Sequence, residues 1–178
     1  IFTMEGTALI KYFSQYPLRI VFLIFTLASM VAIFMFSAED ANVSSDTSGG
    51  FTQTAIELFV QDYDELPAEK QQEIWNKADH IIRKTAHFTI YMCLGFWASC
   101  TLGRRKLMSV KTAAALGFCF LYACTDELHQ YFVPGRACRF KDVMIDTAGA
   151  FTGIVCSMIA IAVVLFAAKK LTAKRKDT

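Results

Sequence analysis

Long apolar runs separated by short polar segments constrain this chain more than any other feature of its sequence. The hydrocarbon core of a bilayer is about 30 Å thick, so an α-helix needs about 20 mostly apolar residues to cross it. The run from Leu18 to Ala38 has this length and the run over 143–168 exceeds it, whereas the runs over 85–102 and 112–132 carry more polar residues. Four such runs predict an all-α fold: an integral membrane protein with four transmembrane helices.

The composition supports one membrane domain followed by a short basic tail. Of the 178 residues 54% are apolar, and the mean hydropathy is +0.38, which excludes an ordinary soluble domain. Residues 1–168 are predicted to form this single domain, because the sequence contains no internal repeat of useful length. Residues 169–178 are rich in Lys and Arg and are interpreted as a cytoplasmic tail facing anionic lipid. We expect no nucleic acid among the partners.

The orientation follows from the basic residues near the ends of the spans, which are retained on the cytoplasmic side. The first run begins too late and is too long for a simple cleavable signal, so we interpret it as a retained span. With the N-terminus inside, the inner segments hold eleven basic residues and two carboxylates. The outer segments hold seven basic residues and fourteen carboxylates. This asymmetry predicts that both termini are cytoplasmic.

The segment between the first two spans is predicted to lie outside. Its opening stretch, SAEDANVSSDTSGG, is small, polar and typical of a surface loop. Phe51, Ala55, Leu58 and Phe59 then follow at helical spacing, which predicts a short amphipathic helix. Two positions for this helix remain open: on the membrane surface or packed against the bundle.

A second helix is predicted to begin at Pro67 and to continue without a break to Leu102. Pro is favoured in the first turn of a helix, and the apolar spacing continues from there into the second span. Such a helix would be roughly 54 Å long, more than a bilayer core, so its first half should protrude or bend.

Polar residues on this helix share one face. His80, Lys84, His87 and Tyr91 are spaced by four, three and four residues, with Arg83 beside them. Lys84 near a helix end is also typical of a cation that extends to the interface. His87 and Tyr91 lie deeper, where they need partners, so either a functional site or a helix–helix hydrogen bond explains them.

The stretch DELHQYFVPGRACRFKDVMID surrounds the predicted turn between the third and fourth spans. Asp126, Glu127, His129 and Gln130 form two polar faces at the end of the third span, and Arg136 and Arg139 follow the turn. Asp142 lies one helical turn before Asp146. Asp146 lies inside an apolar run, where a carboxylate must be paired, hydrated or protonated, and Lys84, Arg136 or Arg139 are available as partners.

These groups converge at the outer face of the predicted topology. His87 lies near the outer start of the second span, DELHQ at the outer end of the third, and Asp142 at the outer start of the fourth. We therefore predict one site there. Its candidates for proton transfer are His87, Asp126 and Glu127, and its candidates for ligand binding are Lys84, Tyr91, Gln130, Arg136, Asp142 and Asp146.

Three motifs in this order, RKTAHFTIYMCLG, TDELHQYFVPGR and KDVMIDTAGAFTG, resemble the VanZ-like family of bacterial membrane proteins. The resemblance implies four spans in the bacterial plasma membrane and an association with resistance to teicoplanin. Family members commonly have Asn at the position of Asp146 and a small hydroxyl residue near Cys138 and Arg139, so Asp146 and Arg139 are expected to compensate each other. The matching positions are Lys84, His87, Tyr91, Asp126, Glu127, Gln130, Gly135, Arg136, Asp142, Gly149 and Gly153.

Three functions remain open from the sequence. The site either modifies or binds a cell-envelope amphiphile, such as a membrane lipid, a lipid-linked cell-wall intermediate or a lipoglycopeptide, or it is a structural polar network. No cofactor is expected. We also expect no metal, because DELHQ lacks the HExxH spacing that presents two imidazoles on one helical face.

Overall fold

The computed structural model describes residues 2–39, 41–103 and 107–174, and this part of the chain is entirely helical, without strands. The elements are α1 (Phe2–Ala38), α2 (Ala41–Phe59), a 3₁₀ turn η1 (Tyr63–Glu65), α3 (Ala68–Leu102), α4 (Val110–Gln130) and α5 (Phe140–Lys174). The predicted all-α fold is confirmed for these residues.

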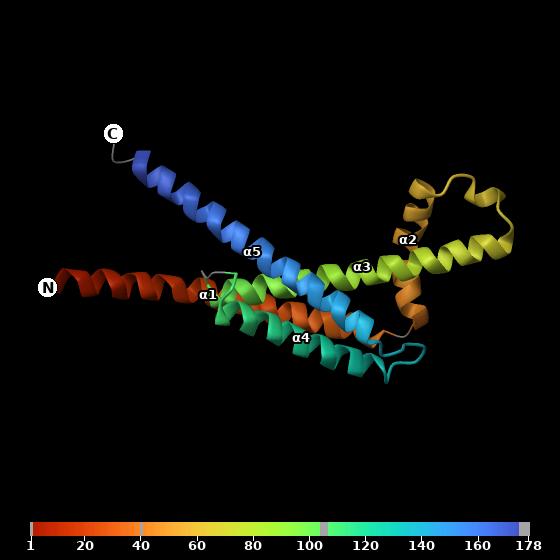
Figure 1. Ribbon diagram of the computed structural model, residues 1–178, viewed down its shortest axis with the longest axis horizontal. Coiled ribbons are helices and arrows are strands. Elements are labelled where there is room, and N and C mark those ends of the chain that lie inside the picture. Colours follow the sequence, from red (N-terminus) through yellow and green to blue (C-terminus); the bar gives the residue numbers. More distant parts are fainter. Residues whose placement is uncertain (1, 40, 104–106, 175–178) are drawn as a thin grey trace.

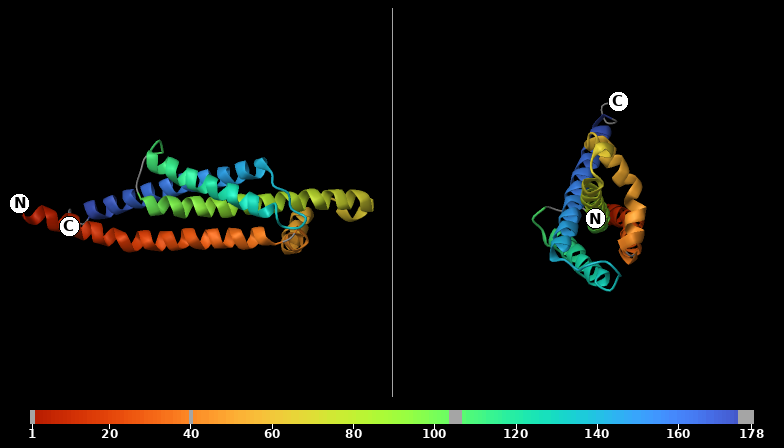
Figure 2. Two further views of the ribbon diagram at one scale, coloured as in Figure 1. Left: turned by 90° about the horizontal axis from the view of Figure 1, so that it is seen from below. Right: turned by 90° about the vertical axis from the view of Figure 1, so that its right-hand side faces the viewer.

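Helix α3 is the centre of the molecule and contacts each of the other four α-helices. Its most extensive contact is with α5, while α1 and α4 complete an elongated bundle (Figure 1). Helix α1 begins and α5 ends at one end of this bundle (Figure 2). The end of α1, the turn between α4 and α5, and α2 gather toward the other end, where the predicted site residues lie.

Glycines allow α3 and α5 to approach closely. A Cβ at Gly149 would overlap the carbonyl of Phe88, and one at Gly153 would overlap the carbonyl of Met92. Gly95 on α3 faces Ala150 in the same way. Small residues at such positions are typical of helix pairs in membranes. Gly149 and Gly153, two of the positions that match the family motifs, are therefore packing residues between α3 and α5.

Two segments of the described chain are long and apolar enough to cross a membrane: Pro17–Ala38 in α1 and Phe140–Ala167 in α5, each with a mean hydropathy of 2.5. Large apolar side chains such as Leu23, Phe34 and Val163 are exposed along them, which suits contact with lipid. The segments predicted to span over 85–102 and 112–132 are helical too, but they are less apolar.

The prediction of a surface loop over the stretch before residue 51 is wrong, because α2 already begins at Ala41. Its small polar side is buried: Ser48 donates to Oδ1 of Asp79 on α3 at 2.5 Å, and Thr52 is fully buried beside it. Phe51, Leu58 and Phe59 are exposed on the opposite side. Tertiary contacts with a buried carboxylate thus favour helix where small polar residues suggested a loop. Helix α2 packs on the bundle and also presents an apolar surface.

The predicted long helix over 67–102 is confirmed. Helix α3 begins after Pro67, has 35 residues and is therefore about 53 Å long. Its first half extends beyond the end of α1, and α2 crosses it there (Figure 1). Residues 104–106, which carry three of the basic residues in the orientation argument, lie outside the described ranges. So do residues 175–178 of the predicted tail, whose first part continues α5 to Lys174.

Candidate functional site

Lys84 and Asp142 form the ion pair that joins α3 to the first turn of α5. The Lys84 Nζ lies 2.5 Å from Oδ2 of Asp142, and their side chains are 26% and 11% exposed. The N-terminal end of a helix also stabilises a carboxylate, because the peptide dipoles leave positive partial charge there. Asp142 therefore has two stabilising contacts, the Lys84 ammonium and the N-terminal end of α5.

Asp126 is the hydrogen-bonding centre between α4 and α1. Its Oδ2 accepts from the Ser37 hydroxyl and from the Gln130 side chain, each at 3.0 Å. Gln130 in turn accepts from Nη1 of Arg136 at 3.3 Å, and Nη2 of Arg136 donates to the carbonyl of Phe36 at 3.0 Å. Since the last carbonyls of a helix lack partners within it, Arg136 caps the end of α1.

Arg136 lies in the turn between α4 and α5, half-buried among other charged side chains. Burial lowers the pKa of its guanidinium, repulsion from Arg83 lowers it further, and Asp126 opposes both effects. An arginine stays protonated in proteins despite such shifts. Arg136 is therefore a permanent cation at this end of the bundle.

Glu127 contacts the backbone of the turn between α4 and α5. Only 2% of the residue is exposed, and its Oε2 accepts from the backbone N–H of Arg139 at 2.9 Å. The side chain of Arg139 itself is exposed. Glu127 thus fixes the turn that carries Arg136 and Arg139.

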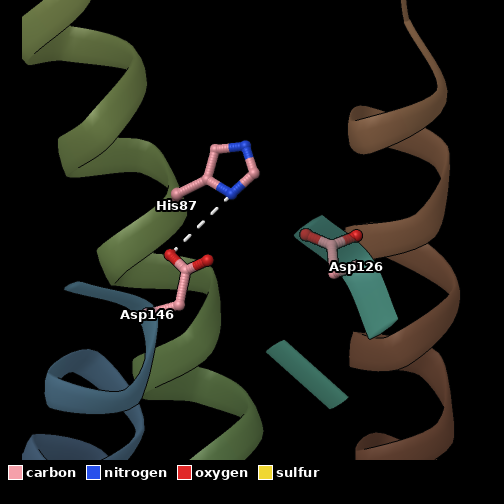
Figure 3. Close-up of side chains that lie close together, drawn as sticks. All are labelled: His87, Asp126 and Asp146. Carbon is pink, nitrogen blue, oxygen red and sulfur yellow. Dashed lines mark ion pairs between the residues drawn. The ribbon is translucent and has the colours of Figure 1, made fainter. Parts of the chain in front are cut away.

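Asp146 faces His87 and pairs with none of the three cations that the sequence made available. Its Oδ1 lies 3.9 Å from Nδ1 of His87 (Figure 3), and its Oδ2 is buried with no hydrogen-bond partner among the described residues. Within that part of the chain Asp146 forms no ion pair with Lys84, Arg136 or Arg139. The proposed compensation between Asp146 and Arg139 is therefore absent, because α5 turns Asp146 toward α3 while the Arg139 side chain points outward.

Tyr91 follows His87 by one turn on α3. It is completely buried, and its hydroxyl has no hydrogen-bond partner in the described part of the protein. Its ring lies 6.3 Å from that of Tyr122, which donates to the carbonyl of Met30 on α1 at 2.7 Å. Tyr91 is thus a core residue whose hydroxyl lies near the Asp126 carboxylate.

A polar cavity of about 180 Å³ opens among these groups. It is bordered by α2, α3, the end of α4, and the turn that leads into α5. Four cations and one carboxylate border it, so its lining carries a positive formal charge. Its lining includes Ser44, His80, Arg83, Lys84, His87, Gln130, Gly135, Arg136, Arg139 and Asp142.

A second, apolar cavity of about 590 Å³ lies beside the first, between α1, α2 and α3. Its walls include Ile33, Ile82 and Ile90, and Ser44, Arg83 and His87 line both cavities. A cavity of this size is in the range that encloses a small ligand. The two cavities therefore share His87 as a common wall.

The structure brings His87, Lys84, Gln130, Arg136 and Asp142 to the polar cavity. The other predicted site residues, Tyr91, Asp126, Glu127 and Asp146, lie outside its lining.

Sequence reasoning missed two contributors to this region. Ser37 holds Asp126, and the only signal was a hydroxyl at the end of the first apolar run. Asp79 is buried and pairs with Arg83 at 3.2 Å, a contact that their spacing of four residues on one helix would have indicated.

The apolar helices and the buried polar cluster at one end of the bundle define a helical membrane protein with a candidate ligand site. The chain belongs to the VanZ/LLP1 family, whose model matches residues 22–163. This confirms the resemblance drawn from the three motifs. No curated protein and no solved structure matched the chain.

Proposed function

We propose that this VanZ/LLP1 protein binds an anionic amphiphile of the bacterial cell envelope, with the head group in the polar cavity and an acyl chain in the apolar cavity. The observation that carries the proposal is the meeting of the two cavities at Ser44, Arg83 and His87. An amphiphile needs a cationic recess next to an apolar one, because its head group and its chain are covalently joined.

The charges of the polar cavity favour phosphate or carboxylate as the head group. Arg136 and Arg139 lie in the turn, and Lys84 and Arg83 lie on α3. Guanidinium groups bind such anions in a bidentate manner. Three classes share this chemistry: anionic membrane lipids, lipid-linked cell-wall intermediates and lipoglycopeptides such as teicoplanin.

In the proposed topology the chain crosses the plasma membrane four times and both termini are cytoplasmic. The site then opens at the extracytoplasmic face, where these amphiphiles are found. Helices α1 and α5 supply the two most apolar spans, and α3 and α4 supply the other two, with their polar residues turned inward. The exposed Phe51, Leu58 and Phe59 of α2 would lie in the outer interface.

The contacts also assign roles within the proposed site. Of the three candidates for proton transfer, His87 lines the cavities, whereas Asp126 and Glu127 each hold neighbouring groups through a carboxylate oxygen. We therefore propose that His87 is the group that would move a proton in any reaction of the bound head group, and that Asp126 and Glu127 position the cavity walls. Binding requires Arg136 whether or not a reaction follows.

We expect Arg136→Gln to weaken binding of dioleoyl phosphatidylglycerol about tenfold, since one charged contact of about 1.4 kcal/mol is lost. Glutamine retains a donor for the carbonyl of Phe36, so the cap of α1 is disturbed little. Bound lipid is counted by native mass spectrometry of the protein in detergent. The exposed Lys77, on the protruding half of α3, provides the matched control: Lys77→Gln should bind as wild type does.

The same titration tests both cavities and ranks the ligands. Ala86→Trp places a large side chain in the apolar cavity. It should weaken binding of the dioleoyl lipid and leave binding of the dihexanoyl lipid unchanged. Polyprenyl phosphate and teicoplanin, added as competitors, separate the three ligand classes. Unchanged lipid affinity in Arg136→Gln would reject the polar cavity as the head-group site.

The proposed orientation predicts that a membrane-impermeant thiol reagent labels Cys138 on intact cells. Cys138 is exposed in the turn between α4 and α5. Labelling should disappear in Cys138→Ser, and a cysteine at Ser109, before α4, should react only after the cells are opened. The opposite pattern would place the site on the cytoplasmic face.

A further inference from the structure

Three side chains of metal-ligating types, from three different helices, meet beside the polar cavity, which His87 lines. They are His87 on α3, Asp126 on α4 and Asp146 on α5, and one ligand atom from each lies within 4.8 Å of the other two. Figure 3 shows the imidazole and both carboxylates turned toward a common space. This convergence requires the tertiary fold, because no two of the three share a helix.

We propose that His87, Asp126 and Asp146 bind a divalent transition-metal ion of the Zn²⁺ or Mn²⁺ class. Imidazole nitrogen and carboxylate oxygen are ligands for both ions. The proposal does not rest on lipid binding, since it requires no occupant of the two cavities. While the ion is bound, the coordinating nitrogen of His87 is a ligand and does not take part in the proton transfer proposed above.

The distances suit one shared ion. Two atoms that each ligate zinc at about 2.1 Å are at most about 4.2 Å apart, and Nδ1 of His87 lies 3.9 Å from Oδ1 of Asp146. That separation is too long for a hydrogen bond between them. An ion placed centrally among three atoms within 4.8 Å of one another would lie at most about 2.8 Å from each. Small side-chain rotations would close the remaining gap.

The two buried carboxylates, Asp126 and Asp146, also favour a bound cation. Asp126 is 5% exposed and Asp146 is 2% exposed, and burying two neighbouring carboxylates is costly without compensation. The nearby cations are engaged elsewhere, since Lys84 pairs with Asp142, and Arg136 donates to Gln130 and Phe36. A divalent ion would neutralise both carboxylates.

Two further observations point to a ligand in this space. The Oδ2 of Asp146 is buried without a hydrogen-bond partner in the described part of the chain, and Figure 3 shows it on the side that faces Asp126. Asp126 is oriented by Ser37 and Gln130, which both donate to its Oδ2. Such outer contacts are typical of metal ligands held in a fixed orientation.

The sequence argument against a metal weighed His87, Asp126, Glu127 and His129 and relied on the spacing within DELHQ, which lacks the two imidazoles of an HExxH site. The structure groups a different set of candidate ligands, His87, Asp126 and Asp146. His129 lies apart from the cluster and stacks on Phe34 of α1, with ring centroids 4.8 Å apart, while His87 arrives from α3. No spacing within one motif could have grouped the three residues.

The test uses the full chain purified in detergent, treated with a chelator and titrated with Zn²⁺ or Mn²⁺ alone. We expect one ion per chain, counted by elemental analysis after gel filtration, and an increase in thermal stability on binding. His87→Gln and Asp146→Asn should each weaken the affinity at least 100-fold. His80→Gln is the matched control, because His80 lies on the same helix at the polar cavity but outside the cluster.

Two outcomes would overturn the proposal: metal-stripped wild type that binds no more ion than His87→Gln does, or binding reduced equally by His80→Gln. Gel filtration and metal-free thermal unfolding of each variant separate lost ligation from misfolding. Lipid binding by the metal-free wild-type protein is measured in parallel. The proposed function and the metal site can therefore fail independently.

Discussion

Replacing Gly153 with alanine is expected to lower the free energy of unfolding by about 3 kcal/mol, as overpacking of a tight contact does. The new Cβ would overlap the carbonyl of Met92 and approach the backbone N of Phe96, both on α3. Backbone atoms cannot rotate away as side chains can, so α3 and α5 must separate along their most extensive contact. Unfolding in mixed micelles with increasing denaturing detergent measures the change.

Gly117 on α4 provides the control, because a Cβ there meets nothing within 4 Å. Gly117→Ala removes the flexibility of a mid-helix glycine and should stabilise the protein by up to about 1 kcal/mol. Equal effects of the two alanines would contradict the close approach of α3 and α5.

Lys84→Met is expected to cost about 3 kcal/mol, because it leaves the buried carboxylate of Asp142 without its cation. This value is at the lower end for a buried pair, since the Lys84 side chain is 26% exposed. Chemical or thermal unfolding of the purified variant measures the loss. Removing both charges, in Lys84→Met with Asp142→Leu, should restore most of it.

The exposed pair Lys77–Glu73 has the same separation of 2.5 Å, but its side chains are 70% and 62% exposed. Lys77→Met should therefore cost less than about 1 kcal/mol. The comparison isolates the effect of burial at constant distance. If Lys84→Met proves equally mild, Lys84 is an interfacial anchor, the alternative that its position near a helix end suggested.

The sequence was sufficient to predict which groups gather at one end of the bundle. Helical spacing placed Lys84 and His87 on one face, and the apolar runs predicted the positions of DELHQ and Asp142 along the bundle axis. The structure does bring these groups together, and it joins Lys84 directly to Asp142. Position along a helix axis follows from chain length, and that is why this part of the site was predictable.

Rotation about the helix axes was not predictable, and the errors follow from it. Asp146 could face any neighbour of α5, and only the packing of Gly149 and Gly153 against α3 turns it toward His87. The bond from Arg139 to Glu127 uses a backbone N–H, which carries no side-chain signal. In α2, Ser48 and Thr52 face Asp79 in the helical conformation, which overrides their weak helix propensity.

Arg136 and the carbonyl of Phe36 that it caps are 100 residues apart in the chain, and Ser37 and Asp126 are 89 apart. During synthesis α1 leaves the ribosome before α4 and α5, and the cap from Arg136 forms only after the α4–α5 turn has been made. Asp146, still later in the sequence, then reaches His87. The polar cluster is therefore completed only after α5 has been made, so a chain arrested before α5 would expose uncompensated charges to quality-control proteases.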